Sequence, residues 1–98
     1  MIHHIVMWKL KEADKKENAH KIKKDLEALK NIIKELKFIQ VGFNMDIAPQ
    51  NNFDVILDTR FNSFEELNIY ANHPEHLKVV EFIKTVIDQR VAIDYEVN

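Results

Sequence analysis

Alternation of apolar and polar side chains predicts four strands along this chain. Residues 1–10 alternate with period two and are rich in β-branched and aromatic side chains, which is typical of a strand. The same pattern predicts strands over residues 38–45, 53–61 and 89–97. Gly42 is the only glycine of the chain. A lone glycine inside a strand predicts a bulge or a close approach of another group to the backbone.

Apolar residues spaced by three and four positions predict the helices. The clearest stripe ends near Lys37 and consists of Ala19, Ile22, Leu26, Leu29, Ile33 and Leu36. Ser63, followed by Glu66 three residues later, is the signature of a capping box and predicts a short helix that ends near Ala71. Pro74 suits the first position of a further helix. The apolar stripe of that helix consists of Leu77, Val80, Ile83 and Ile87, widened by Val79, Phe82 and Val86.

The predicted order of elements is β-α-β-β-α-α-β. Two right-handed β-α-β crossovers around a central hairpin give an α+β, ferredoxin-like protomer, with a four-stranded antiparallel sheet and all helices on one face. The strands at 1–10 and 53–61 carry large apolar residues on both faces, where a half-exposed sheet is polar on one. An uncovered apolar face usually marks an interface. We therefore expect a homodimer that forms through the sheet face.

The composition of the chain excludes several classes of function. A chain of 98 residues predicts one domain, residues 1–98. The absence of cysteine excludes disulfides, zinc–thiolate sites, iron–sulfur clusters and a cysteine nucleophile, and in so small a domain it favours the cytoplasm. The net charge of −2 does not favour nucleic-acid binding. No apolar run approaches the ~20 residues of a membrane span, so no membrane partner is expected.

Lysines concentrate in one part of the chain. Residues 9–37 contain ten lysines and six acidic residues. This segment could bind phosphate or a membrane surface, or it could be the solvated face of a helix. The acids are interleaved with the lysines, which favours the solvated face.

Histidine and tyrosine side chains supply the candidate chemistry. His3 and His4 are adjacent in a strand and point to opposite faces, so one enters the helix-covered interior and the other the expected interface. His76 lies in the first turn of the helix that begins at Pro74, and Tyr70 precedes it near the end of the short helix. A phenol can hydrogen-bond a developing oxyanion and an imidazole can accept a proton. We expect Tyr70, His76 and His4 to line one pocket between sheet and helices.

Further contacts to a substrate are expected from an apolar floor made by Val6 and Trp8, and to a lesser extent from His73, which we expect mainly to hold the loop as an N-cap. The ordinary structural interpretation remains open: His73 as the N-cap of the helix, His76 as a half-buried helix residue and Tyr70 at the edge of the core. A metal site built from His73, His76 and a strand histidine is a third interpretation. It has no obvious carboxylate and no thiol, so no metal is expected. With no glycine-rich phosphate loop and no serine nucleophile motif, we expect no nucleotide chemistry and no cofactor.

Five short segments, residues 4–10, 42–44, 61–67, 70–76 and 94–95, together resemble the stress-response A/B barrel (dimeric α/β barrel, or Dabb) domain family. The most specific part is Tyr-x-x-His-Pro-x-His at 70–76, combined with His-x-Val in the first strand. The resemblance covers essentially the whole chain. It implies a ferredoxin-like protomer and a dimer in which two sheets close into a barrel.

The resemblance also implies a range of functions. The chain is similar to the plant polyketide (olivetolic acid) cyclases of this family, which close a linear polyketide by aldol condensation. Their acid/base tyrosine and histidine correspond to Tyr70 and His76, and the strand histidine corresponds to His4. A first hypothesis is acid/base chemistry on a small carbonyl or polyketide-like compound, of cyclase, isomerase or lyase type. The second is a stress-linked, ligand-binding dimer without catalysis, and the third a cofactor-free monooxygenase, whose pocket Trp8 would suit.

Overall fold

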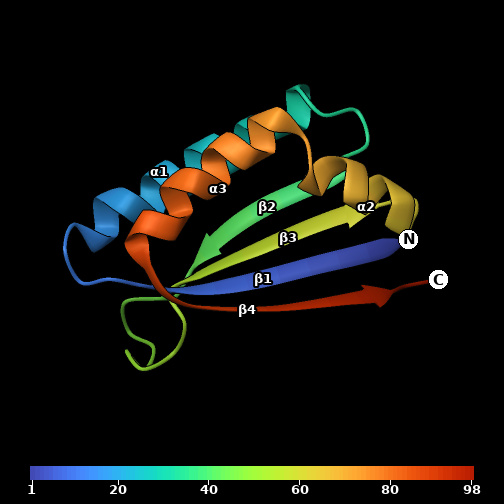
Figure 1. Ribbon diagram of the computed structural model, residues 1–98. Coiled ribbons are helices and arrows are strands. Elements are labelled where there is room, and N and C mark those ends of the chain that lie inside the picture. Colours follow the sequence, from blue (N-terminus) through green and yellow to red (C-terminus); the bar gives the residue numbers. More distant parts are fainter.

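The computed structural model describes residues 1–98 as one layer of helices on one face of a four-stranded sheet (Figure 1). The strands are antiparallel in the order β2-β3-β1-β4. This confirms the predicted ferredoxin-like fold. The elements are β1 (Ile2–Leu10), α1 (Lys15–Glu27), a 3-10 helix (Ala28–Asn31), β2 (Phe38–Phe43), β3 (Val55–Phe61), α2 (Phe64–Ala71), α3 (Pro74–Val86) and β4 (Ile87–Glu96).

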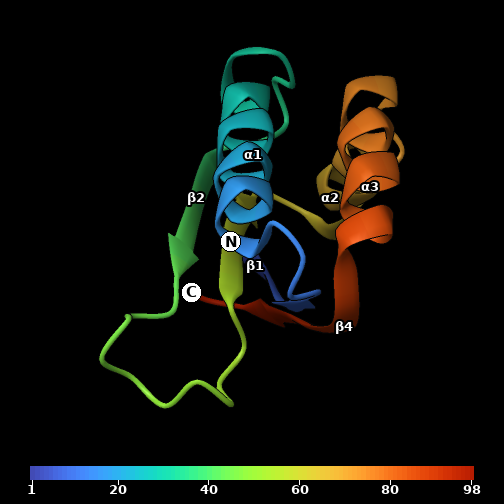
Figure 2. The ribbon, with the colours of Figure 1, turned by 90° about the vertical axis from the view of Figure 1, so that its left-hand side faces the viewer.

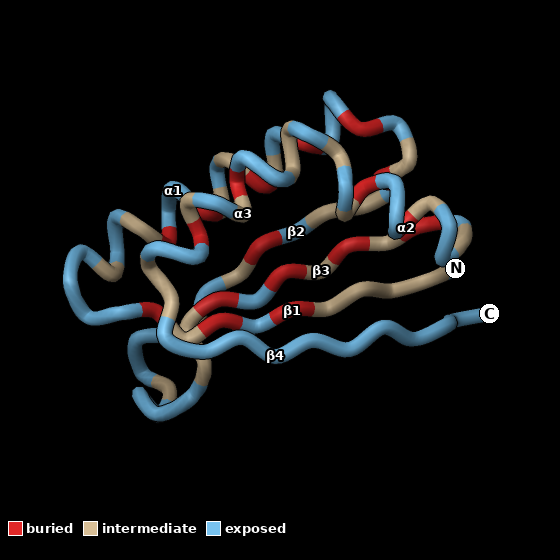
Figure 3. The backbone as a smooth tube through the Cα atoms, in the orientation of Figure 1, coloured by how far each residue is buried: buried red, intermediate tan, exposed pale blue.

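The core lies between the two layers. Figure 2 shows α1 and α3 side by side above the sheet, and Figure 3 shows the buried positions gathered on the facing sides of helices and strands. Alternate residues of β1, such as Val6, Trp8 and Leu10, are buried there. The same period of two buries Val55 and Leu57 in β3, because successive strand side chains point to opposite faces.

Local capping signals determine where α2 and α3 begin. The Ser63 hydroxyl accepts a hydrogen bond from the Glu66 backbone N–H at 3.1 Å, as predicted. The Glu66 carboxylate accepts one from the Asn62 N–H at 3.4 Å, one residue earlier than a full capping box requires. Pro74 is the first residue of α3, and His73 is its N-cap, with Nδ1 accepting from the Glu75 N–H at 3.1 Å.

The predicted end of the first helix near Lys37 is wrong. The helix α1 ends at Glu27, tightens into the 3-10 helix and then turns towards β2. The chain must turn here to reach the start of β2 at Phe38, and the isoleucines at 32 and 33, whose β-branched side chains lose rotamer freedom in a helix, do not favour a return to the helix. Leu29, Ile33 and Leu36 are nevertheless buried, since successive tight turns return every third or fourth side chain to the same side.

Of the two outcomes predicted for Gly42, a bulge and a close approach, the structure shows the close approach. The pairing of β2 with β3 is regular at Gly42, and the irregularity of the sheet falls at Lys9/Leu10 instead. A Cβ at position 42 would lie 3.3 Å from Ile56 Cγ2, so the glycine serves the close approach of that side chain. The open face of β3 is more polar than predicted, because Arg60 and Asp58 form an ion pair there at 3.1 Å.

Apolar residues of the open face gather on β1 and β4 instead. The antiparallel register sets Met7 opposite Val91 and Ile5 opposite Ile93. Ile93 is 61% exposed and Val91 43% exposed. The open face of the sheet therefore carries a half-exposed apolar patch along its β1–β4 side.

Lys16, Lys21 and Lys24 of α1 are exposed, whereas Lys23 is half-buried and donates to the Val41 carbonyl of β2 at 2.7 Å. Lys21 pairs with Asp25 and Lys23 with Glu27, each at 2.8 Å and one helical turn apart. Such spacing stabilises an exposed helix face. No helix of the structure is both long and apolar enough to cross a bilayer.

Candidate functional site

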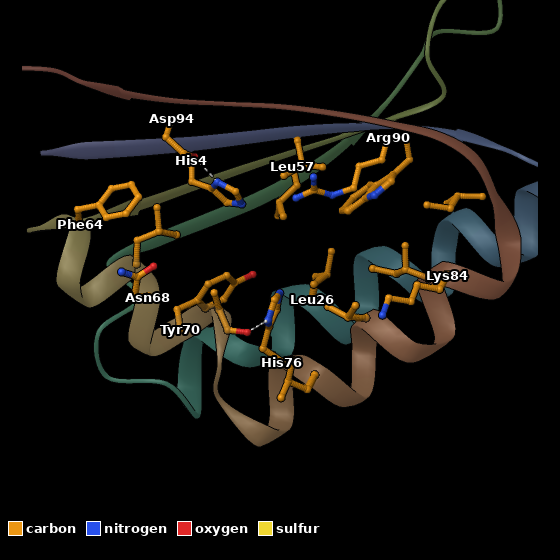
Figure 4. Close-up of a pocket in the computed structure, with 18 residues that line it drawn as sticks. His4, Leu26, Leu57, Phe64, Asn68, Tyr70, His76, Lys84, Arg90 and Asp94 are labelled. Carbon is orange, nitrogen blue, oxygen red and sulfur yellow. Dashed lines mark hydrogen bonds and ion pairs between the residues drawn. The ribbon is translucent and has the colours of Figure 1, made fainter.

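A cavity of about 400 Å³ lies between the helices and the sheet. All three helices and strands β1, β3 and β4 contribute to its lining, and 12 of the 18 lining residues are hydrophobic (Figure 4). The size and the mostly apolar wall are those of a small-molecule site. The apolar wall includes Leu26, Leu57, Leu67, Leu77, Val80 and Ile83.

The structure brings together most of the residues that the sequence singled out. His4, Val6, Trp8, Tyr70 and His76 all line the cavity. The sheet supplies the first three and the helices the last two, so the polar groups face one another across the cavity (Figure 4).

Two of the histidines lie elsewhere. His73 is outside the cavity lining and caps α3. His3 lies on the open face of the sheet, where its ring packs against Tyr95 with centroids 5.2 Å apart. Nowhere in the structure do three His, Asp or Glu side chains gather in a way that could hold a metal ion.

His76 presents Nε2 to the cavity (Figure 4). Its Nδ1 lies 3.0 Å from the carbonyl oxygen of Ala71. A carbonyl only accepts, so Nδ1 carries the proton and Nε2 of the neutral ring has a free lone pair. Burial lowers the pKa of His76, and repulsion from His4, His73 and Arg90 lowers it further, against the opposing effect of the Ala71 hydrogen bond. The imidazole is therefore neutral at neutral pH, as a general base must be.

Tyr70 is buried, with only 1% of its surface exposed, and its hydroxyl makes no hydrogen bond. Its ring packs on His76 with centroids 4.3 Å apart, and on Phe61 at 5.1 Å. Desolvation raises the pKa of the phenol, so the hydroxyl keeps its proton. The side chain is thus a fixed hydrogen-bond donor that points into the cavity (Figure 4).

His4 is oriented by a carboxylate. The register of β1 and β4 sets His4 opposite Asp94, and His4 Nδ1 donates a hydrogen bond to Asp94 Oδ1. This leaves Nε2 facing the cavity, as in Figure 4. A carboxylate on one ring nitrogen fixes the tautomer and stabilises the imidazolium when the other nitrogen takes a proton.

Sequence reasoning missed several polar residues of the lining: Asn68, Lys84, Arg90 and Asp94. Alternation along the last strand does place Arg90 and Asp94 together on one face, which is correct. Their membership of the site depends on β4 pairing with β1, and no local signal in the sequence reports that register.

A protein-family model described as Stress responsive A/B Barrel Domain matches residues 2–97 of the chain. The chain belongs to this family. The match confirms the family resemblance carried by the Tyr-x-x-His-Pro-x-His segment and the first strand. Members of the stress-responsive A/B barrel family with curated descriptions include two proteins of Arabidopsis thaliana.

The first, stress-response A/B barrel domain-containing protein DABB1, is 24% identical over 99 residues, which cover 97% of this chain and 46% of the relative. The second, another stress-response A/B barrel domain-containing protein of the same plant, is 29% identical over 96 residues, covering 97% of this chain and 36% of the relative. The chain thus spans less than half the length of the curated relatives it matches.

Solved structures of other proteins share the fold. A dimeric protein of unknown function with a ferredoxin-like fold from Bacteroides fragilis has a TM-score of 0.90 and 29% identity, covering 98% of this chain and 95% of that chain. A hydroxynitrile lyase from Passiflora edulis has a TM-score of 0.85 and 22% identity, covering 99% and 93%. At that identity the likeness to the lyase is one of fold.

Proposed function

We propose that this A/B barrel protein catalyses proton transfer on a small carbonyl compound bound in the cavity, as a cyclase, isomerase or lyase does. The observation that carries the proposal is the convergence of three groups on one apolar space. Two imidazoles present Nε2 there, and one phenol presents a proton that no protein atom accepts. General acid–base catalysis and oxyanion stabilisation need these components within an enclosed site.

The two histidines differ in a way that suits them to opposite tasks. His76 is kept neutral by burial, so it can take a proton. Asp94 holds His4 through Nδ1, so Nε2 of His4 faces the cavity, where it can take up a proton from solvent and pass it to the substrate. Pairs of titratable groups in unlike environments are how a site divides acid and base work.

The proposed step removes a proton from the carbon next to the substrate carbonyl. The C–H bond breaks, and the proton goes to Nε2 of His76. The electron pair forms a C=C bond, and the carbonyl π electrons move to oxygen to give an enolate. The Tyr70 hydroxyl donates a hydrogen bond to that oxygen, in a cavity whose apolar walls strengthen the interaction. After the enolate has reacted onward, His4 takes a proton from solvent at Nε2 and passes it to the product, and His76 releases its proton to solvent, so both rings return to their starting state.

We further propose that the chain works as a homodimer in which two sheets face each other. The apolar patch that includes Met7, Val91 and Ile93 supports this, because an exposed apolar patch on a small protein marks an interface. The Bacteroides fragilis relative is described as dimeric. A second sheet would cover the open face while leaving the cavity on the opposite side of each sheet.

The test is exchange of α-protons for deuterium in 2-octanone, a neutral ketone, followed by NMR in D2O. We expect the wild type to accelerate exchange above the buffer rate. His76→Asn and Tyr70→Phe should each reduce the acceleration about 10²-fold or more. Lys34→Gln, on the exposed surface outside the cavity lining, should leave it unchanged.

The same experiment separates catalysis from the alternatives. If the wild type binds 2-octanone but exchange proceeds at the buffer rate, the catalytic proposal is wrong and the ligand-binding dimer takes its place. The cofactor-free monooxygenase rests on Trp8, which is buried in the cavity floor at 5% exposure. Trp8 contributes no proton-transfer group, so the observed polar cluster favours acid–base chemistry.

A further inference from the structure

The cavity contains a second polar region, which the proposed proton transfer does not use. Arg90 reaches from β4 into the cavity towards His4 and Leu57 (Figure 4). Its guanidinium makes no hydrogen bond and no ion pair within the chain. Lys84 of α3 also lines the cavity, and its one acidic neighbour is Glu81, at 4.0 Å. Two cationic side chains therefore border an otherwise mainly apolar space.

The acidic residues of the cavity lining do not neutralise the charges of Arg90 and Lys84. Asp94 is the only acidic residue of the cavity lining, and it accepts the hydrogen bond from His4. The repulsion that Arg90 exerts on His76 places its charge within electrostatic reach of the reacting groups. Arg90 and Lys84 are exposed, so water screens their charge on the outer side, while the apolar wall on the inner side strengthens their attraction for an anion that enters the cavity.

The chemistry of arginine indicates which anion. Its planar guanidinium presents donors in a fork that matches the two oxygens of a carboxylate. Building on the proposed function, we propose that Arg90 binds a carboxylate of the substrate, so that the carbonyl compound is an oxo acid: an apolar chain that bears a ketone and a carboxylate. Lys84 adds attraction for the same negative charge.

The arrangement of the cavity suits such a molecule. Arg90 extends from the sheet and Tyr70 from the helices, so the carboxylate and the ketone oxygen have separate partners on opposing walls (Figure 4). The apolar chain of the substrate would contact Leu67, Leu77 and Val80 in the cavity wall. A bound carboxylate also cancels part of the repulsion that Arg90 exerts on His76, which couples substrate binding to the base.

The test compares two unreactive probes of equal length, octanoate and octanamide, by isothermal titration calorimetry on the full chain at low salt. The wild type should bind octanoate about tenfold more tightly than octanamide, since a charge-assisted hydrogen bond is worth at least that factor. Arg90→Gln should remove most of the preference and leave only the small part that the charge of Lys84 supplies. Arg90→Lys, which keeps the charge and loses the fork, should retain part of it. Lys34→Gln makes the same charge change on the surface and should retain all of it.

Equal affinity of the wild type for the two probes overturns the carboxylate site. An undiminished preference for octanoate in a folded Arg90→Gln variant also overturns it. If the glutamine variant does not fold, an undiminished preference in Arg90→Lys does so instead. The outcome is independent of catalysis, because neither probe reacts. A protein that exchanges the α-protons of 2-octanone but shows no preference for octanoate retains the proposed function and loses the carboxylate site. A protein that prefers octanoate but does not exchange the α-protons of 2-octanone retains the carboxylate site and loses the proposed function.

Discussion

Tyr70 is the residue whose environment is least explained by packing. Its ring is buried between Phe61 and His76, as core aromatics are, but its hydroxyl has no partner. An unsatisfied buried hydroxyl costs about 1–3 kcal/mol. A phenylalanine would fill the same space without that cost. A tyrosine at this position is therefore accounted for by chemistry, as expected where stability is sacrificed for a functional group.

Tyr70→Phe should consequently raise the free energy of unfolding by about 1 kcal/mol while it removes the catalysed exchange of 2-octanone. Urea denaturation of the two proteins at one concentration measures the first effect, and NMR the second. A variant that is less stable than the wild type would show that the hydroxyl is hydrogen-bonded in solution, and it would remove the argument for a donor held ready for the substrate.

At the scale of elements, the apolar stripe that starts in α1 continues beyond the end of that helix. Leu29 lies in the 3-10 helix and is 2% exposed. Leu29→Ala should cost about 2–5 kcal/mol, because deletion of a buried leucine leaves a cavity. Lys24→Ala, on the exposed side of α1, should change stability by less than ~0.5 kcal/mol. Equal urea midpoints for the two variants would contradict the assignment of the stripe to the core.

The elements that the sequence predicts well are those with local causes. The Ser63 hydroxyl, the His73 ring and the fixed backbone of Pro74 act within a few residues, so the starts of α2 and α3 can be found by inspection. The end of α1 depends on where β2 must begin, and that is set by the sheet. The local pattern of 3- and 4-residue spacing therefore continues through a segment that is no longer α-helical.

The candidate site likewise contains some residues that the local sequence predicts and others that it does not. His4, Tyr70 and His76 belong to recognisable segments, and alternation in a strand indicates which neighbouring histidine enters the interior. The partnership of His4 with Asp94 joins residues 90 positions apart, and it exists only because β4 pairs with β1 in one register. Which residues of β4 meet the site is a property of the assembled sheet, so Arg90 could be placed on a face but not in the cavity.

At the scale of the whole molecule, the open sheet face is the surface that lacks a partner. Ile93 lies on the edge strand β4, is 61% exposed and pairs with Ile5 of β1. Ile93→Arg should abolish the homodimer and leave a folded monomer, because a charge on that face would be buried without a partner. Sedimentation velocity at micromolar concentration measures the change.

Ile47 supplies the matched control. It is 89% exposed and lies in the loop between β2 and β3, outside the sheet. Ile47→Arg introduces the same charge and should leave the sedimentation coefficient of the wild type unchanged. A dimer that persists in Ile93→Arg, or a wild type that sediments as a monomer, would show that the open face is not the contact between copies.

The junction of α3 and β4 has a mechanical consequence. Val86 ends the helix and Ile87 begins the strand without a loop, and the Lys11 N–H donates to the Val86 carbonyl at 2.9 Å, which fastens the junction to the end of β1. The helix α3, which forms one wall of the cavity, is therefore joined directly to β4 at this point. We expect any movement of α3 on ligand entry to move the start of β4 as well, and β4 carries Ile93 on the open face of the sheet. Ligand entry on one side of the sheet would then alter the surface on the other side.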